Sequence, residues 1–216
     1  MLAALEGGRA ADLEGVTLKG ARFAILTSTV FDDIRDAPKA AFEVAVARLR
    51  DAGAEIEEIT SPEVEEAMPI SPILFTSEAY GTWGHLIEAA PEAMFAPIRE
   101  RFESGKAFTA ADYIAAWRRL EELRERWYAR TAGYDAVLMP TAPILPPDAA
   151  RLMTDNEYYV TENLLALRNT RVGNLMGLCG VTLPTGTPSC GILLSGKPFG
   201  EEALLRVAKA AEAVLR

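Results

Sequence analysis

The sequence predicts an α/β fold, because segments with the pattern of strands alternate with segments that have the pattern of helices. The apolar run ARFAILTS (21–28) is typical of a buried strand, and AEIEEIT (54–60) alternates apolar and acidic residues as a half-exposed strand does. A helix-forming segment, 36–53, separates them, with Asp36 as the expected N-cap and Gly53 as the end. Together they predict a β-α-β unit with parallel strands.

The middle of the chain is predicted to be helical over 77–90, 91–105 and 109–133. Thr109 is the expected cap of the third helix, and Asp112 occupies the position of a capping-box acid. Apolar residues recur on this helix at spacings of three and four, which predicts one buried face. The members of this face are Ile114, Trp117, Leu120, Leu123 and Trp127.

The last third of the chain is predicted to contain three strands and two helices. YDAVLMP (134–140) has the pattern of a central strand, and 179–186 and 189–196 are two further short strands. A helix is expected over 156–177 and an amphipathic helix over 200–216. The total of about five strands predicts a sheet that is small for so many helices.

We expect residues 1–216 to form a single α/β domain with three parts. These are a β-α-β unit (1–62), a helical region (63–133) and a strand-loop-helix core (134–216). Apolar residues make up 50% of the chain, which favours a well-developed core.

The charge and the cysteine content limit the classes of function. The net charge of −9 gives no electrostatic drive toward nucleic acid, so no direct nucleic-acid binding is expected. No apolar run approaches the length of a membrane span, and the N-terminus lacks the pattern of a signal peptide. Two cysteines do not form a disulfide framework, which favours a cytoplasmic protein.

No catalytic group is predicted from the residues themselves. His85 is the only histidine, and there is no Cys-x-x-Cys, so neither a metal site nor a cofactor is expected. A Cys-His pair could be formed by Cys179 or Cys190 with His85. However, Cys179 lies in an apolar run, where a cysteine is usually a small buried hydrophobe. There is no Gly-x-Ser-x-Gly elbow for a serine triad.

Two loops at strand ends are the best candidates for a ligand pocket. MPTAP (139–143) comes after the strand 134–140, and LPTGTP (183–188) comes after the strand 181–184. Open α/β sheets bind ligands outside the carboxyl ends of their strands. We therefore expect a pocket beside these loops.

The same loops belong to a longer pattern that resembles the amidase signature family. YDAVLMPTAPILPP and RNTRVGNLMGLCGVTLPTGTPSCGILLSGKPFGEEALLRVAKAAEAVL are similar to its C-terminal strand, Asn-x-x-Gly segment and closing helix. ARFAILTSTVFDDI and FESGKAFTAADY resemble earlier segments of the family, and MLAALEGG resembles the tail of a family helix. The resemblance covers nearly the whole chain and implies a mixed sheet covered by helices.

The resemblance also implies what this chain lacks. Family members, which include amide hydrolases and the A subunit of glutamyl-tRNA(Gln) amidotransferase, use a Ser nucleophile, a second Ser and a Lys in an upstream Gly/Ser-rich region. That region is not matched here, so the expectation is a substrate-side fragment that is inactive alone. The alternative is a non-enzymatic binding or assembly module. Self-association and an upstream amidase half are both possible partners.

The candidate substrate-binding residues follow from the same resemblance. Arg101 occupies the place of a family Arg that holds substrate, whereas Arg168 and Asn169 stand near the place of a family Asp. Asn174 belongs to the Asn-x-x-Gly segment and can equally shape the backbone there. Tyr80 is either a core aromatic residue or a pocket wall. The expected ligand is a small amide or carboxylate.

Overall fold

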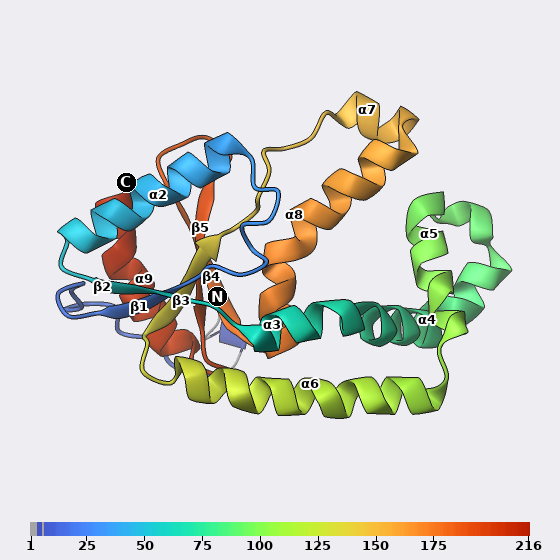
Figure 1. The fold of residues 1–216 in the computed structure, drawn as a ribbon, viewed down its shortest axis with the longest axis horizontal. Helices are drawn as coiled ribbons and strands as arrows, with labels where there is room; N and C mark the ends of the chain where they lie inside the picture. The colour runs from blue at the N-terminus through green and yellow to red at the C-terminus, as the bar shows by residue number, and fades with distance from the viewer. Residues whose placement is uncertain (1–3, 6) are drawn as a thin grey trace. The chain divides into compact units, whose positions relative to one another are not determined.

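The computed structural model describes residues 4, 5 and 7–216 (Figure 1). The N-terminal pattern MLAALEGG therefore lies in part outside the described residues. The chain divides into two compact units. The sheet unit comprises the residues up to 61 together with 128–216, and the helical unit comprises 62–127.

A five-stranded mixed sheet forms the centre of the sheet unit. Its strands among the described residues are β1 (Arg22–Leu26), β2 (Glu55–Ile59), β3 (Ala136–Pro140), β4 (Cys179–Pro184) and β5 (Gly191–Gly196). Their order is β2-β1-β3-β5-β4, with β1 parallel to β2 and β3, and β5 antiparallel to β3 and β4. The predicted α/β class with a mixed sheet is confirmed, as are the parallel strands of the β-α-β unit, and every strand lies within two residues of its predicted bounds.

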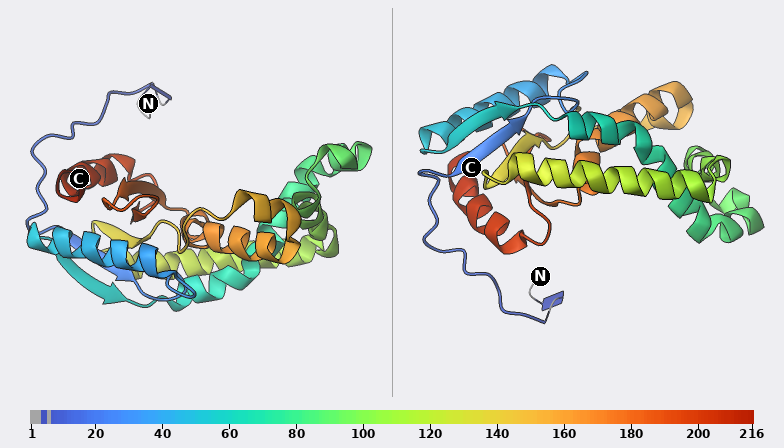
Figure 2. Two further views of the ribbon diagram at one scale, coloured as in Figure 1. Left: turned by 90° about the horizontal axis from the view of Figure 1, so that it is seen from above. Right: turned by 60° about the horizontal axis from the view of Figure 1, so that its bottom comes forward.

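Helices α2 (Asp36–Asp51) and α9 (Glu201–Leu215) pack against one face of this sheet (Figures 1 and 2). Their apolar side chains share a buried cluster with alternate strand residues such as Phe23, Leu138 and Leu194. Strand residues that point to the opposite face, such as Leu26 and Met139, are also fully buried. Burial on both faces explains the continuous apolar runs of these strands.

Helix α8 (Asn156–Met176) follows the short helix α7 (Ala149–Thr154) and ends as predicted at Gly177. Gly177 has a φ of 67°, the left-handed conformation that commonly ends helices. The last turn of α8 is anchored, since the Tyr128 hydroxyl donates to the Met176 carbonyl at 2.7 Å.

The predicted N-cap of α2 is wrong. Asp36 is the first helical residue, and Arg35 holds the N-cap position without any side-chain capping bond. Tertiary contacts fix this turn instead, because the Arg35 N–H donates to the Pro143 carbonyl at 2.9 Å and its guanidinium pairs with Glu162. Asp36 still favours the helix by its charge near the positive end of the dipole.

The helical unit contains α3 (Pro62–Ala67), α4 (Ser71–Ala89), α5 (Ala96–Glu103) and most of α6 (Ala110–Thr131). Helix α4 begins six residues before the predicted start at 77. The helix predicted over 91–105 is instead divided into the 3₁₀ turn Pro91–Ala93, α5 and a second turn, Ser104–Ala107. Pro97 in the first turn of α5 explains the break, because a helix running on from Ala93 would need the backbone N–H that proline lacks.

The capping box of α6 is confirmed, but its predicted buried face is only partly correct. The Thr109 N–H donates to Asp112 at 2.9 Å, and the Asp112 N–H donates to the Thr109 hydroxyl at 3.1 Å. Leu120 and Trp127 are buried, whereas Ile114 is 55% exposed. Successive steps of three residues rotate about 60° around a helix, so two such steps carry Ile114 away from the buried face.

The turn Ser104–Ala107 packs so closely on α4 that only glycine fits at position 105. A Cβ there would lie 2.2 Å from the Thr76 carbonyl oxygen, whereas a Cβ at Gly81 in α4 would meet nothing within 4 Å. Gly105→Ala should therefore destabilise the protein by about 1–3 kcal/mol in urea unfolding. Gly81→Ala is the matched control and should be neutral or stabilising by up to about 1 kcal/mol. Equal effects of the two substitutions would contradict the packing described.

Candidate functional site

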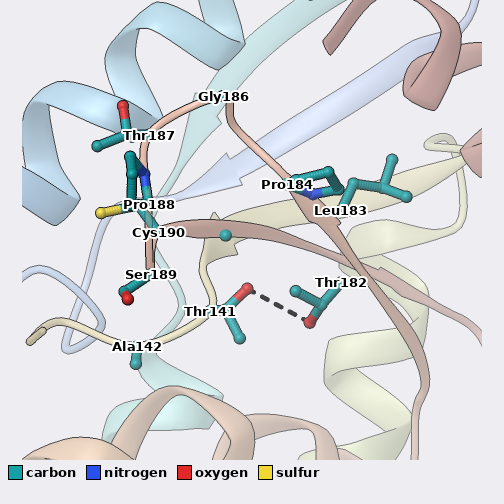
Figure 3. A pocket seen from close by; sticks show the side chains of 11 residues that line it. Thr141, Ala142, Thr182, Leu183, Pro184, Gly186, Thr187, Pro188, Ser189 and Cys190 are labelled. Atoms are coloured by element: carbon teal, nitrogen blue, oxygen red, sulfur yellow. Dashed lines mark hydrogen bonds between the residues drawn. The ribbon is translucent and has the colours of Figure 1, made fainter. Parts of the chain in front are cut away.

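A pocket of about 650 Å³ lies where β3 and β4 end and β5 begins (Figure 3). It is lined by residues 141–142, 182–184 and 186–191. Both loops that the sequence singled out contribute to this lining, residues 141–142 from one and 183–184 and 186–188 from the other, so the prediction that both loops border a pocket is confirmed. Because β3 and β4 both run antiparallel to β5, their carboxyl ends lie at this same edge of the sheet.

Backbone hydrogen bonds fix the loop between β4 and β5. The Thr185 N–H and the Thr185 hydroxyl both donate to the Cys190 carbonyl, at 3.3 and 3.0 Å. The Cys190 N–H donates to the Thr187 carbonyl at 3.1 Å. Gly186 and Ser189 take positive φ values of 87° and 60°, which is unusual for serine. The loop is thus a defined turn that holds its side chains in place.

The pocket offers neutral hydroxyl groups beside apolar walls. Thr141 directly follows β3 and Thr182 belongs to β4, and the Thr141 hydroxyl donates to the Thr182 hydroxyl at 3.3 Å (Figure 3). Gly191 permits this arrangement, since a Cβ there would lie 2.7 Å from the Thr141 hydroxyl oxygen. Thr187 and Ser189 add two more hydroxyl groups, and none of the lining residues is Asp, Glu, Lys, Arg or His. Such a lining suits an uncharged polar group of a ligand.

Both cysteines are held as neutral thiols. Cys190 is buried, and burial raises the pKa of its thiol. Burial also raises the pKa of Cys179, with a further rise from the charge of Glu201, and its Sγ donates to the Lys197 carbonyl at 3.2 Å. Cys179 packs on the core of the sheet unit, which supports its interpretation as a small hydrophobe. His85 belongs to α4 in the helical unit.

Asn169 is fully buried and connects α8 to the ends of two strands. Its Nδ2 donates to the Pro140 carbonyl at 2.7 Å and to the Val30 carbonyl at 3.2 Å. Pro140 ends β3, and Val30 lies in the loop that follows β1. The carboxamide therefore fixes the backbone directly before Thr141, which places Asn169 in support of the pocket.

Arg168 holds the loop after β1. Its Nη2 donates to the Val30 carbonyl at 3.0 Å and its Nη1 donates to the Asp32 carbonyl. Burial lowers the pKa of Arg168, and the charges of Asp32 and Asp33 oppose this shift. An arginine remains a cation after such a shift, so the guanidinium acts as a charged clamp on this loop.

A second connection holds the same loop from α8. The Arg35 Nη2 lies 2.5 Å from Oε1 of Glu162, whose side chain is only 6% exposed. Thr29 and Asp33 have positive φ values of 57° and 50° within the loop. Such backbone conformations persist where surrounding contacts impose them. Contacts from α8 therefore shape the loop after β1.

The other candidate residues lie elsewhere. Asn174 is exposed on α8, whereas Arg101 and Tyr80 belong to α5 and α4 of the helical unit. Arg101 is half-buried. The Tyr80 hydroxyl donates to Glu88, and this hydrogen bond is the main cause of the raised pKa of Tyr80. The Lys106 Nζ lies 4.8 Å from the centroid of the Tyr80 ring. Arg168 and Asn169 are in contact with each other, since the Arg168 Nε donates to the Asn169 Oδ1 at 3.3 Å.

The sequence identified the pocket loops but not the hydroxyl groups that line them. Thr141 stands directly after a predicted strand, and Thr182 stands near the end of one. This position near the carboxyl ends of strands is the feature of the sequence that could have indicated both residues as part of the pocket. Their proximity depends on the antiparallel order β3-β5-β4, which the sequence pattern did not specify.

Residues 4, 5 and 7–216 show neither a metal-binding cluster nor a membrane-spanning helix. They contain no group of three or more His, Cys, Asp or Glu side chains that could hold a metal ion. None of their helices has the length and apolar character needed to span a membrane.

Comparisons with known proteins identify the family. The family described as Amidase matches residues 7–205, and the chain therefore belongs to the amidase family. It is 31% identical over 210 residues to 2-amino-5-chloromuconic acid deaminase of Comamonas testosteroni, covering 93% of this chain and 44% of that protein. It is 30% identical over 206 residues to an amidase of Pseudomonas putida, covering 92% of this chain and 44% of that protein.

A solved structure shows the same fold. A crystal structure of an amidase superposes with a TM-score of 0.79 at 24% identity, covering 99% of this chain and 49% of that one. The chain thus spans less than half the length of these relatives.

The Asn169 contacts predict a large effect of substitution. Asn169→Ala removes the donor to the buried Pro140 carbonyl and should lower the free energy of unfolding by about 1–3 kcal/mol. Amide exchange of residues 29–33 should also accelerate. The control is Thr170→Ala, because Thr170 is exposed and bonds only within its own helix; it should change stability by less than about 0.5 kcal/mol. Similar results for both variants would refute the connecting role.

The thiol environments predict slow alkylation. Because burial favours the neutral thiol, Cys179 and Cys190 lose their protons at higher pH in the folded protein than in the unfolded chain. At pH 7.5, iodoacetamide should modify the native protein more slowly than the urea-unfolded chain, with the rate rising toward alkaline pH. A native thiol that reacted faster than the unfolded chain would instead support a cysteine nucleophile.

Proposed function

We propose that this chain forms the substrate side of an amide-hydrolysing site, and that the catalytic serines and lysine come from outside it. The observation that carries the proposal is a hydroxyl-lined pocket at the strand ends of an amidase-family chain. The chain spans less than half the length of its relatives, which agrees with a partial site. Alone, the chain is expected to be inactive.

In the complete site, a serine hydroxyl from the other half attacks the amide carbonyl carbon. A tetrahedral intermediate forms, the C–N bond breaks and the amine leaves with a proton, which produces an acyl-enzyme. Water then releases the carboxylic acid. The role of this chain is to orient the amide, with the hydroxyls of Thr141 and Thr182 as hydrogen-bonding groups and Asn169 as the support of their backbone.

The lining of the pocket favours an uncharged amide over a carboxylate. A carboxylate in a protein site is usually paired with a cation, and the residues that line this pocket include none. The Arg168 guanidinium, which could have supplied one, is occupied by the carbonyls of Val30 and Asp32. We place this activity in the cytoplasm, where the two free cysteines would stay reduced.

The helical unit favours a second function, as a binding or assembly module. Trp83 and Leu86 are each 52% exposed and line an apolar hollow of about 420 Å³ together with Met94 and Phe102. Exposed apolar surface of this kind is typical of interaction sites.

The preference for an uncharged ligand is testable on the isolated chain. Benzamide should shift the backbone amide resonances of Thr141, Thr182 and Ser189 in a titration, whereas benzoate should bind about tenfold more weakly because its charge would be unpaired. The control is Thr170→Ala, which lies outside the lining and should bind benzamide like the wild type. Thr182→Val should weaken benzamide binding. Tighter binding of benzoate would contradict the proposal.

A further inference from the structure

A buried carboxylate lies on the helix that supports the pocket. The side chain of Glu162 in α8 is only 6% exposed, and the Arg35 Nη2 lies 2.5 Å from its Oε1. A buried ion pair contributes little to stability, because the cost of removing charge from water offsets the attraction between the partners. An apolar side chain would fill the same space without that cost. The charge of Glu162 therefore needs an explanation other than stability.

The partner of this carboxylate is bonded directly to a pocket loop. The Arg35 N–H donates to the Pro143 carbonyl at 2.9 Å, and Pro143 follows the lining residue Ala142. From this anchored backbone, the Arg35 side chain reaches Glu162 on α8. The charge of Arg35 therefore lies within the length of one arginine side chain from the backbone that binds the pocket loop.

Glu162 itself lies on the face of α8 that supports the pocket. It precedes Asn169 by two helical turns, which is about 10 Å along one face of the helix. Asn169 is fully buried and donates to the Pro140 carbonyl, directly before the lining residue Thr141. The Glu162 carboxylate is therefore on the order of 10–15 Å from the pocket, where its charge can act on a bound anion.

The second cation near these loops is also matched by acids. Arg168 donates to backbone carbonyls of the loop after β1, and Asp32 and Asp33 lie close enough for their charges to act on its guanidinium. Glu162 matches Arg35 in the same region. Among these five side chains the acids outnumber the cations, so an anionic ligand meets no favourable potential at the pocket loops.

We propose that Glu162 is a specificity-determining residue, which excludes carboxylates from the pocket by matching the charge of Arg35. This inference rests on the proposed function, in which the ligand is an uncharged amide. Without Glu162, the unmatched guanidinium of Arg35 would attract an anion to the pocket. Amide hydrolysis converts a neutral ligand into a carboxylate, so the same charge balance favours release of the acid product. Glu162 is not a lining residue and acts through its charge.

The expected size of the effect follows from Coulomb's law. One unit charge about 10–15 Å away changes the affinity for an anion by about fivefold to fifteenfold at an effective dielectric constant of about 20. The Arg35 side chain is 54% exposed, so solvent reduces this factor. Removal of the Glu162 charge should therefore raise the affinity for a carboxylate by about threefold to tenfold and change the affinity for an uncharged amide by less than about twofold.

The test compares the binding of benzamide and benzoate to the whole chain in resonance titrations. Glu162→Gln removes the charge but keeps a carboxamide oxygen that can accept from Arg35, so the loop geometry should persist. This variant should bind benzoate about threefold to tenfold more tightly than the wild type does, and benzamide equally. Glu157→Gln is the matched control, because Glu157 is exposed on the same helix; it should leave both affinities unchanged.

A double variant separates the effect of charge from an effect on structure. Arg35→Gln alone leaves the Glu162 charge unmatched and should weaken benzoate binding further. Arg35→Gln combined with Glu162→Gln removes both charges and should restore the wild-type ratio of the two affinities. A merely structural role would instead weaken the binding of both ligands in every variant. If circular dichroism shows that Arg35→Gln does not fold, the double variant, which leaves neither charge unmatched, supplies the comparison.

Three outcomes would overturn the inference. These are an unchanged benzoate affinity in Glu162→Gln, an equal loss of both ligands in that variant, and a double variant that binds benzoate as tightly as Glu162→Gln does. A wild type that binds neither ligand would contradict the proposed function as well as the inference. A wild type that prefers benzamide, with the same preference in Glu162→Gln, would contradict the inference alone.

Discussion

The buried carboxamide of Asn169 is the interaction on which the candidate site depends. It joins α8 to the carbonyl of Pro140 at the end of β3 and to the carbonyl of Val30 after β1. The carbonyls are thereby satisfied in a region without water access, where an unpaired acceptor would cost about 1–3 kcal/mol. Arg168, the preceding residue, holds the same loop from its more exposed side.

These contacts give the amidase-family pattern RNTRVGNLMG (168–177) a physical meaning. The first Arg and Asn of the pattern fix the loops at the carboxyl ends of β1 and β3, and Gly177 ends the helix. The turn between β4 and β5 then completes the pocket through its own backbone hydrogen bonds. The result is a shaped, neutral pocket that still needs a nucleophile.

Much of this fold could be predicted from the sequence, because apolar runs and the regular spacing of apolar residues indicate which segments and helix faces are buried. The strand order could not be predicted, since the antiparallel insertion of β5 between β3 and β4 depends on contacts far apart in the chain. The predicted Asp36 cap is wrong because tertiary contacts, not a local side chain, fix the start of α2. The predicted burial of Ile114 is wrong because repeated spacings of three residues do not stay on one face of a helix. For Arg168 and Asn169, the sequence indicated proximity to a site, but their backbone partners emerge only in three dimensions.

The account holds that this chain carries the substrate side of an amidase site and that the reaction centre lies outside it. The most direct measurement is ammonia release from a neutral primary amide by the purified chain, with and without the catalytic half of a family relative. The account predicts no release by the chain alone and release on addition of that half. Turnover by the chain alone that persists after substitution of every Ser and both Cys would contradict it.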